Sequence, residues 1–536
     1  MAQDGPAGTP SNDEIAVFAF VEYGLTDIAT RLESDPAEAI RQVSEFIEDL
    51  RADAGLVLSP PVRAFALTRA AGVMIDAADI ADDRDALRAG MAVAENVSEN
   101  PSFPDDLRVT ATHFRANALG GLFASEMGDA RDSGPIEMSD ALWKHRGLVH
   151  HARVLQLSVW ASADASEVLR SRAACNLANL LDDMGRWVEA YEWYQRALEL
   201  DPSNGNAAGN IAVALNRVLA MGWASPGHVA ALYNHYLELA QQLQEDTARI
   251  AGAGTARRYA DMQFIDGQIG HLLHSGDDQD DYQRWIVEHR LALAPAVEGL
   301  GKDGPHWDSV TLSAARAVPD QAGPPPVFAM LDALKAEFVA ARRLAYSALC
   351  TLESATASQG PADSGVYAAV GDGIVQGEHI AQLVLAQRSA LDALDKLAVV
   401  ANEHLNLGEE PSRIDFRKFW QKDSGIRPGL CHGNSDGRAA FALADLADDL
   451  GTNGLYSHSQ ALRNAGTHRI VVASLTEGSL NAGRDSMSTI DLDTLIASTL
   501  EALKVARAAY LYLIGLFEDW LTCDPLDGPL MPLMDQ

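Results

Sequence analysis

Cysteines and long apolar runs are scarce in this sequence. Four cysteines occur among 536 residues, and none forms a Cys-x-x-Cys pair. This argues against a disulfide framework or a cysteine-rich zinc site and suits a reducing cytoplasm. No apolar run approaches the roughly 18–20 residues that span a bilayer, and the opening residues MAQDGPAGTPSNDE are polar and acidic, unlike a signal peptide. We therefore expect a cytoplasmic protein with no membrane partner.

Positive charge is also in short supply. The chain has 41 basic and 75 acidic residues, for a formal net charge of −34. So acidic a surface repels a phosphate backbone at long range, which disfavours non-specific nucleic-acid binding along the whole chain. Any nucleic-acid chemistry must therefore take place in a local basic pocket or wait for a signal.

Strand-like patterns are nearly absent. Alternating Val, Ile and Thr runs bounded by turns are rare, whereas apolar residues recur at spacings of three and four along most of the chain. The length favours two to four domains. The sequence therefore predicts an all-α protein with more than one domain.

Residues 171–215, SRAACNLANLLDDMGRWVEAYEWYQRALELDPSNGNAAGNIAVAL, carry the clearest local pattern. Gly185 falls at a turn between two helical stretches, and Pro202 closes the unit. The stretch resembles a tetratricopeptide repeat, a helix-turn-helix unit about 34 residues long. Ala174 stands where the repeat usually has Trp, and Leu181 where it usually has Tyr, so the groove departs from the standard peptide-binding form.

One repeat cannot bury its apolar face alone, because solenoids need roughly three or more stacked units. The flanking sequence supplies further helical hairpins, and we predict a degenerate repeat array over 13–317 that binds a protein or peptide trigger, or an antitoxin. The predicted helical segments are 14–50, 61–97, 106–127, 139–168, 228–250 and 256–295.

Residues 318–327, VPDQAGPPPV, interrupt the helical pattern. Consecutive prolines cannot continue a helix and favour an extended conformation, so we interpret this stretch as a linker. We expect a helical bundle over 328–522, a disordered N-terminus over 1–12 and a tail over 523–536. Within the bundle the predicted helices are 327–357, 374–406, 436–450, 456–476 and 492–521, with a turn-rich insertion at 422–437.

The stretch ALRNAGTHRI (461–470) places Arg463, Asn464 and His468 in an otherwise apolar, helix-like context. Polar groups that face a bundle core need partners or a purpose. An Arg five positions before a His is not specific by itself. The same spacing occurs at Arg108/His113, Arg146/His151, Arg284/His289 and Arg427/His432, but only Arg463 is followed by a polar amide.

The C-terminal region resembles the HEPN superfamily, in the bacterial branch that accompanies repeat-type helical arrays. The resemblance is carried by LVLAQRSALDALDKLAVVANEHL (383–405), RIDFRKFW (413–420) and LRNAGTHR (462–469). Active HEPN domains are helical bundles with an Arg-polar-x3-His motif, and most are metal-independent endoribonucleases that dimerise to build the site. The resemblance implies that His468 is the acid/base residue, Arg463 binds phosphate and Asn464 assists, with no metal and no cofactor. The products would carry 2′,3′-cyclic phosphate and 5′-OH ends.

The spacing within the motif has a geometric consequence. Asn464 and His468 share a helix face, but Arg463 and His468 lie about 140° apart around an ideal helix. Either Arg463 sits at an irregular helix start, which Gly466 would favour, or two motifs related by a two-fold axis contribute to one phosphate. We therefore expect a homodimer through the bundle.

A basic and aromatic segment, RIDFRKFWQKDSGIR (413–427), stands out against the acidic background. Cations bind phosphate and aromatic rings stack on unpaired bases. We therefore take Arg417, Lys418 and Trp420 as candidate RNA-binding residues, together with Arg469 beside the motif. The alternative is an ordinary amphipathic segment whose aromatic residues lie in the core.

Other polar clusters have simpler interpretations. HRGLVHH (145–151) lacks a carboxylate or Cys at ligand spacing, GDGIVQG (371–377) lacks a phosphate-binding lysine, and Arg388, Asp392 and Asp395 favour structural ion pairs. Two functions remain. One is a ribonuclease effector of a toxin or anti-phage system, which the repeat array restrains; the other is a non-enzymatic scaffold that dimerises through an inactive bundle.

Overall fold

The structure is a computed structural model of the whole chain. It describes residues 11–52, 58–131, 135–221, 226–266, 272–302, 307–313, 325–354, 374–375, 377–423, 425–431, 437–451, 454–457, 470–474 and 487–523.

Contacts divide the chain into two compact units, and each is described by itself. Unit 1 comprises Met1–Asp183, Ala190–Asn210 and Glu238–Met262. Unit 2 comprises Met184–Glu189, Ile211–Leu237 and Gln263–Gln536. Helices α9, α10 and α11 have residues in both units.

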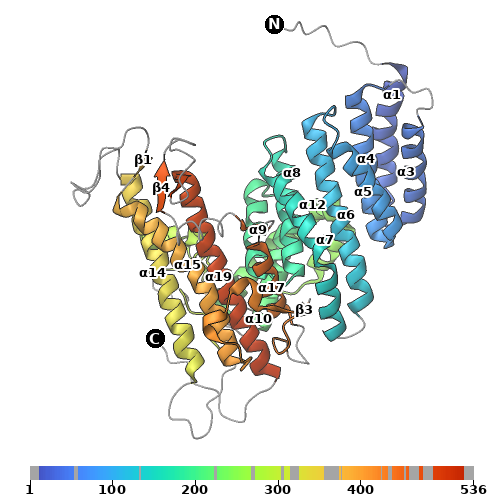
Figure 1. The fold of residues 1–536 in the computed structure, drawn as a ribbon. Helices are drawn as coiled ribbons and strands as arrows, with labels where there is room; N and C mark the ends of the chain where they lie inside the picture. The colour runs from blue at the N-terminus through green and yellow to red at the C-terminus, as the bar shows by residue number, and fades with distance from the viewer. Residues whose placement is uncertain are drawn as a thin grey trace. The chain divides into compact units, whose positions relative to one another are not determined.

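In the described part of the first half of the chain, every secondary-structure element is a helix (Figure 1). Local sequence explains several helix starts. Asp35 and Asp83 accept backbone hydrogen bonds at the N-termini of α3 and α5, and a proline follows Asp35 as the first helical residue. The elements are α1 (Asn12–Ala19), the π-helix η1 (Phe20–Leu25), α2 (Thr26–Thr30), α3 (Pro36–Arg51), α4 (Pro60–Ala81), α5 (Arg84–Ser98), α6 (Asp105–Arg131), α7 (Pro135–Ala161), α8 (Glu167–Asp183), α9 (Trp187–Leu200), α10 (Gly205–Ala220), α11 (Pro226–Gln242) and α12 (Gln244–Asp261).

The turn between α8 and α9 lies where the sequence predicts it. Gly185 has a φ of +79°, a left-handed conformation that favours glycine. A Cβ atom at this position would lie 2.4 Å from the carbonyl oxygen of Arg438, so a side chain is excluded sterically as well. This turn, residues 184–189, belongs to unit 2.

Long helices also dominate unit 2. The start of α14 and the bounds of α17 and α19 agree with the predicted helices to within a few residues. Buried side chains such as Leu391, Phe441 and Leu511 form the interior between α15, α17 and α19. The remaining helical elements are α13 (Asp281–His289), α14 (Pro326–Ser354), α15 (Glu378–His404), the 3₁₀ turn η3 (Pro411–Arg413), α16 (Phe416–Phe419), α17 (Arg438–Asp449) and α19 (Leu492–Cys523).

Two small sheets accompany these helices. Strands β1 (Ile374–Val375), β4 (Ile470–Ser474) and β5 (Met487–Asp491) form a sheet in the order β1-β4-β5, with β1 antiparallel and β5 parallel to β4. Strands β2 (Gln421–Lys422) and β3 (Gly425–Ile426) pair in an antiparallel hairpin.

The sheets correct two helix predictions. The helix predicted over 456–476 is wrong at 470–474, which form β4. The run Ile470-Val471-Val472 is β-branched and fits a pleated, half-buried surface better than a helix. The predicted helix over 374–406 begins only at Glu378, after β1. In the predicted 256–295 segment, α12 ends at Asp261 and α13 covers only Asp281–His289.

Residues 281–302 and 307–313, which fall within the predicted repeat array, belong to unit 2 together with the bundle helices. The buried Arg507 of α19 donates to the carbonyl oxygens of Ala292 and Ala294 at 2.6 and 2.7 Å. Arg342 of α14 pairs with Asp308 at 2.7 Å. Buried arginines of the bundle thus bind this segment. Helical periodicity in the sequence does not reveal such contacts.

Candidate functional site

The predicted motif lies between two described segments of the chain. Arg463, Asn464, His468 and Arg469 lie outside the described residues, as does His432 of one of the similarly spaced pairs. The motif segment follows the turn at 454–457 and precedes β4, both of which are described. The geometry of these two ends determines how the motif is joined to the bundle.

The turn that leads to the motif is fixed to the end of α17. The backbone N–H of Tyr456 donates to the carbonyl oxygen of Asp449 at 2.9 Å. Gly454 packs directly on the same residue, because a Cβ atom there would lie 2.1 Å from that carbonyl oxygen. The chain therefore leaves α17 along a closely packed path.

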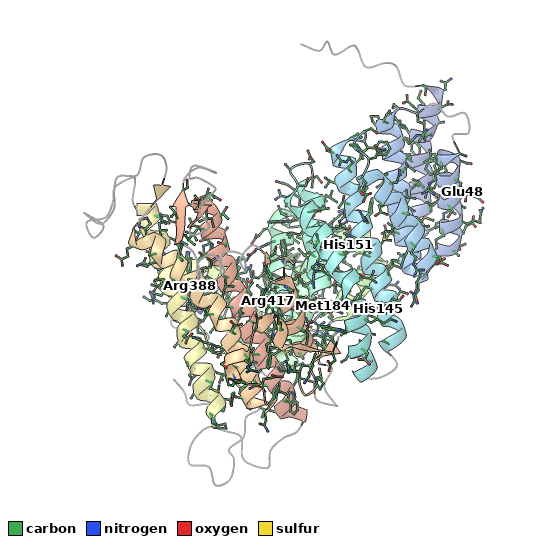
Figure 2. All side chains as sticks on the ribbon, viewed as in Figure 1. Glu48, His145, His151, Met184, Arg388 and Arg417 are labelled. Carbon is green, nitrogen blue, oxygen red and sulfur yellow. The ribbon has the colours of Figure 1, made fainter. Side chains whose placement is uncertain are left out.

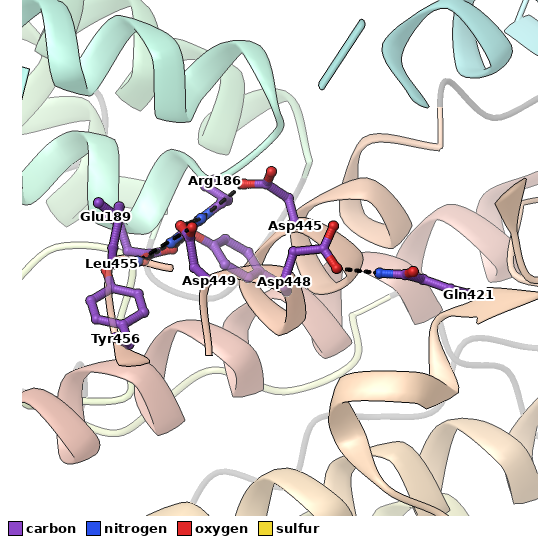
Figure 3. Close-up of polar contacts among 9 residues, drawn as sticks. Arg186, Glu189, Gln421, Asp445, Asp448, Asp449, Leu455 and Tyr456 are labelled. Carbon is purple, nitrogen blue, oxygen red and sulfur yellow. Dashed lines mark hydrogen bonds and ion pairs between the residues drawn. The ribbon is translucent and has the colours of Figure 1, made fainter. Parts of the chain in front are cut away.

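A buried cluster around Arg186 also contacts this turn (Figure 3). Arg186, in the turn between α8 and α9, has no exposed surface. Its Nη1 donates to Asp445 at 2.8 Å and also to Asp449, both on α17. Its Nε and Nη2 donate to the two oxygens of Glu189 at 2.8 and 2.5 Å. The guanidinium thus links the repeat-like turn to α17.

Two tyrosines complete this cluster. The hydroxyl of Tyr456 donates to Oε1 of Glu189, and the hydroxyl of Tyr512 on α19 donates to Oε2 at 3.0 Å. Burial and the charge of Glu189 raise the pKa of both tyrosines well above the ordinary value, so both hydroxyls keep the proton that they donate. Burial disfavours the charge of Arg186, but Glu189 and Asp449 outweigh it and hold its pKa well above the ordinary value.

The chain after the motif is anchored as well. Ala473 of β4 is fully buried and belongs to a small core with Leu383 of α15, Ile490 of β5 and Leu495 of α19. The parallel pairing of β4 with β5 fixes the register of this strand. Both ends of the motif segment are therefore attached to the bundle helices.

The basic and aromatic segment corrects one predicted RNA-binding residue. Trp420 has no exposed surface, and Phe416 and Phe419 are also buried, with ring centroids 5.4 and 4.9 Å from the Trp420 ring. A ring without exposed surface cannot stack on a base, so the prediction for Trp420 is wrong in this arrangement. The aromatic side chains of the segment therefore lie in the core, as the alternative interpretation of an ordinary amphipathic segment predicts.

The cations of this segment differ in what they contact. Lys418 is exposed and makes no ion pair within the described part of the chain. Arg417 is partly exposed, and its Nη2 lies 3.5 Å from Asp415. Arg427, by contrast, pairs with Glu409 at 2.6 Å and its guanidinium carbon lies 4.9 Å from the Phe419 ring centroid. Arg417 and Lys418 therefore remain candidates for RNA binding, whereas Arg427 is held by its structural partners.

The end of α17 contacts both the basic segment and the turn that precedes the motif in the chain. Gln421, directly after Trp420, donates to Asp448 at 2.5 Å, while the neighbouring Asp449 holds Arg186 and Tyr456 (Figure 3). The carboxylate of Asp448 thus binds the segment that contains Lys418, and the backbone carbonyl oxygen of Asp449 binds the turn that leads to Arg463. Sequence reasoning did not identify Arg186, Glu189, Asp445 or Asp449 as important. A hint was present in Asp445 and Asp449, which are spaced i, i+4 on the largely apolar α17.

His113, in one of the similarly spaced pairs, has a structural role. His113 is buried, and its ring lies 2.9 Å from Oε1 of Gln156. Burial lowers its pKa to about 4, against a smaller opposite effect of that hydrogen bond. His145 and His151 lie on α7 (Figure 2), and no cluster of three His, Cys, Asp or Glu side chains among the described residues could hold a metal ion.

Arg388 lies on α15 (Figure 2), and the predicted ion pairs of Arg388, Asp392 and Asp395 stay a prediction. Asp395 accepts a hydrogen bond from the backbone N–H of Phe416 at 2.8 Å. This carboxylate therefore holds the start of α16 and with it the basic segment.

Helix α12 covers polar residues of the repeat-like helices within unit 1. The hydroxyl of Tyr259 lies 2.9 Å from Oδ1 of Asn206 and 2.6 Å from Oδ1 of Asn210, on α10. Gly209 gives the ring its space, because a Cβ atom there would lie 2.3 Å from it. A partner that uses these asparagines would have to displace Tyr259.

The fold therefore joins a helical-repeat region to a helical bundle, and comparison with known families gives both parts a name. Residues 318–519 match the model of the LA2681-like HEPN family, and residues 171–204 match the tetratricopeptide repeat. No curated protein matches the chain. The resemblance inferred from the sequence is confirmed, and so is the all-α fold with a repeat array before a HEPN-type bundle. Among the described helices, none has the length and apolarity to cross a membrane.

Proposed function

We propose that this protein is a metal-independent endoribonuclease. The observation that carries the proposal is that Arg463, Asn464 and His468 form an Arg-polar-x3-His motif inside the region similar to LA2681-like HEPN domains, residues 318–519. HEPN domains are frequently ribonucleases. Supporting geometry comes from the anchored ends of the motif segment, since catalytic groups need a rigid support.

The chemistry requires few groups. The 2′-OH of RNA attacks the adjacent phosphorus, a new O2′–P bond forms, and the P–O5′ bond breaks. His468 accepts the proton of the 2′-OH, and an imidazolium donates a proton to the departing 5′ oxygen. Arg463 stabilises the negative charge on the pentacoordinate phosphate, and Asn464 orients the neighbouring groups. The products are a 2′,3′-cyclic phosphate and a 5′-OH end.

An ideal helix would place Arg463 and His468 on different faces, so one motif alone would not bring both side chains to one phosphate. A homodimer would supply both groups. Arg463 and His468 are five positions apart, and a two-fold axis would bring two arginines and two histidines to one phosphate. One histidine could then act as base while the other acts as acid.

RNA would be held by local cations, because the net charge of −34 repels phosphate elsewhere. Lys418, Arg417 and Arg469 are the proposed phosphate contacts. The first two lie three and four positions before Gln421 in the sequence, and the hydrogen bond of Gln421 to Asp448, next to the Asp449 that accepts from Tyr456, supports this proposal. Trp420 takes no part, since its ring is buried.

The repeat array would regulate this activity. Tetratricopeptide repeats mediate protein interactions, and we propose that the array senses a protein or peptide trigger, or an antitoxin, in a cytoplasmic toxin or anti-phage system. Because Tyr259 covers Asn206 and Asn210, such a partner would bind another face or displace α12.

The proposal is tested with the full-length protein, RNA and EDTA. The protein should cut RNA, leave 2′,3′-cyclic phosphate ends, and leave untouched both DNA of the same sequence and RNA whose 2′ oxygens are methylated. If the methylated RNA is cut at the same rate, the 2′-OH is not the nucleophile. If no RNA is cut at any protein concentration, the non-enzymatic scaffold replaces the ribonuclease.

A further inference from the structure

Helix α10 of unit 1 carries a site that the side chain of Tyr259, on α12, fills. The ring lies against Gly209, where a Cβ atom would be 2.3 Å from it. The hydroxyl donates toward Oδ1 of Asn206 at 2.9 Å and Oδ1 of Asn210 at 2.6 Å. Burial raises the pKa of Tyr259 above its ordinary value, so the hydroxyl keeps the proton that it donates. The site therefore matches a tyrosine in both its ring and its hydroxyl.

The two asparagines are oriented by α8 and α9, without any contribution from α12. Nδ2 of Asn210 donates to Oδ1 of Asn179 at 2.9 Å, and the same oxygen accepts from the hydroxyl of Tyr194 at 2.7 Å. Nδ2 of Asn206 donates to Sγ of Cys175 at 3.5 Å. Because both amide NH2 groups are used in this way, both carboxamide oxygens are left for a donor from outside. The site is therefore built before α12 enters it.

Helix α12 is lightly attached to the rest of unit 1. Three of its 18 residues are buried: Thr247, Ala256 and Tyr259. Gly252 interrupts the helix with a φ of +85°, and the next backbone N–H, that of Ala253, donates to the exposed Glu33 at 2.6 Å. Gln241 of α11 donates to the carbonyl oxygen of Tyr259 at 3.2 Å. A segment with so few buried side chains opens more readily than the helices beneath it.

We propose that α12 is a displaceable internal ligand of the repeat-like helices, and that a protein or peptide partner binds by placing a tyrosine of its own where Tyr259 lies. This inference rests on the proposed function in one respect, that the array has such a partner, and it adds the chemistry that the partner carries. A phenylalanine would leave the oxygens of Asn206 and Asn210 without a donor. An aliphatic side chain would leave the surface at Gly209 unfilled.

Two glycines provide a matched pair of variants for hydrogen exchange. Gly209→Ala places a methyl group against the Tyr259 ring, whereas a Cβ atom at Gly147 of α7 would have no atom of the described chain within 4 Å. Both glycines are helical and alanine favours a helix, so both full-length variants should fold. In Gly209→Ala, residues 244–261 should exchange at least about tenfold faster than in wild type, while α8 and α10 keep the wild-type rate. In Gly147→Ala all three should exchange as in wild type.

Two results of this experiment would overturn the inference. If residues 244–261 exchange at the wild-type rate in Gly209→Ala, the seat of Tyr259 does not hold α12 in place. If Gly209→Ala also loses protection in α8 and α10, α12 is part of the core of unit 1 and not a displaceable ligand.

A labelled peptide of residues 244–262 tests the partner's chemistry. Full-length Tyr259→Ala lacks the internal ring, so this peptide should bind it at least about tenfold more tightly than it binds wild type, where the tethered α12 competes. The peptide with Tyr259→Phe should bind about threefold to tenfold more weakly, because it lacks the hydroxyl donor. The peptide with Tyr259→Ala should not bind. Equal affinity of the native and Tyr259→Ala peptides, or no binding of the native peptide to the Tyr259→Ala protein, would contradict the proposal.

The failure of the inference is distinguishable from the failure of the proposed ribonuclease, because both experiments are made without RNA. If His468→Ala cuts RNA as fast as wild type while the native peptide binds as expected, the catalytic assignment is wrong and the tyrosine site stands. If His468→Ala is inactive and the native and Tyr259→Ala peptides bind alike, the ribonuclease stands and the tyrosine site is wrong.

Discussion

Arg186 and Asp445 lie 259 positions apart in the chain, yet Nη1 of Arg186 donates to the Asp445 carboxylate at 2.8 Å in the interior of unit 2. Because the guanidinium also contacts Asp449 and Glu189, one side chain joins the turn of the repeat, the end of α17 and, through Glu189, Tyr456. The region similar to HEPN domains is thus completed by residues that precede it by more than a hundred positions.

The first prediction concerns the stability of this cluster. Arg186→Gln should lower the free energy of unfolding by about 3–5 kcal/mol, since three buried carboxylates lose their guanidinium partner. Arg88→Gln is the control, because Arg88 forms an exposed ion pair with Asp85 and should show no measurable change. Denaturant unfolding of both variants makes the comparison. Equal stabilities would mean that the Arg186 cluster contributes little.

The second prediction concerns the isolated bundle. A fragment of residues 327–536 lacks Arg186 and Glu189, the carbonyl groups of Ala292 and Ala294 that accept from Arg507, and the Asp308 partner of Arg342. We expect this fragment to unfold at a much lower temperature than the full chain and to be cleaved rapidly in limited proteolysis. A fragment that melts cooperatively at the full-length temperature would contradict the division of the chain into these two units.

Sequence reasoning succeeded where the pattern is local. The apolar spacing of α17 and α19 predicts their bounds to within a few residues, and the helix-turn-helix at α8 and α9 carries its own turn signal in Gly185. These features depend on neighbours in the chain, so a single sequence contains enough information to find them.

It failed where distant residues decide the outcome. The run that forms β4 continues an apolar helical pattern, but it pairs with β1 and β5 as a strand. The importance of Arg186 depends on Asp445 and Asp449, which no local pattern connects to it. Trp420 shows the same limit. The composition of its segment suits RNA stacking, but neighbouring aromatic rings pack against Trp420 and its own ring is buried.

The third prediction concerns RNA affinity. Lys418→Gln should raise KM severalfold and reduce the slope of log affinity against log salt concentration by about one, as the loss of one phosphate contact does. Lys396→Gln removes an exposed lysine of the same unit that already pairs with Glu337 at 2.5 Å, and should change neither quantity. If the two variants bind RNA equally, the basic segment is not a phosphate contact.

The fourth prediction concerns pH. Burial lowers the pKa of His113 to about 4, so the unfolded chain binds a proton between about pH 6.5 and pH 4 that the folded chain does not. This contribution to stability is therefore complete above pH 6.5 and falls by about 3 kcal/mol as the pH drops to 4. In His113→Gln the contribution should be absent. If the melting temperatures of wild type and His113→Gln fall equally as the pH drops, His113 is not responsible for the loss of stability.

The measurement that tests the central claim most directly is the rate of RNA cleavage in EDTA by the full-length protein and by His468→Ala. A general acid or base contributes roughly 10²–10⁴-fold, so the variant should cut at least about 100-fold more slowly while its melting temperature stays that of wild type. Cleavage by His468→Ala at the wild-type rate would contradict the account, because the motif at Arg463, Asn464 and His468 would then not be the catalytic site.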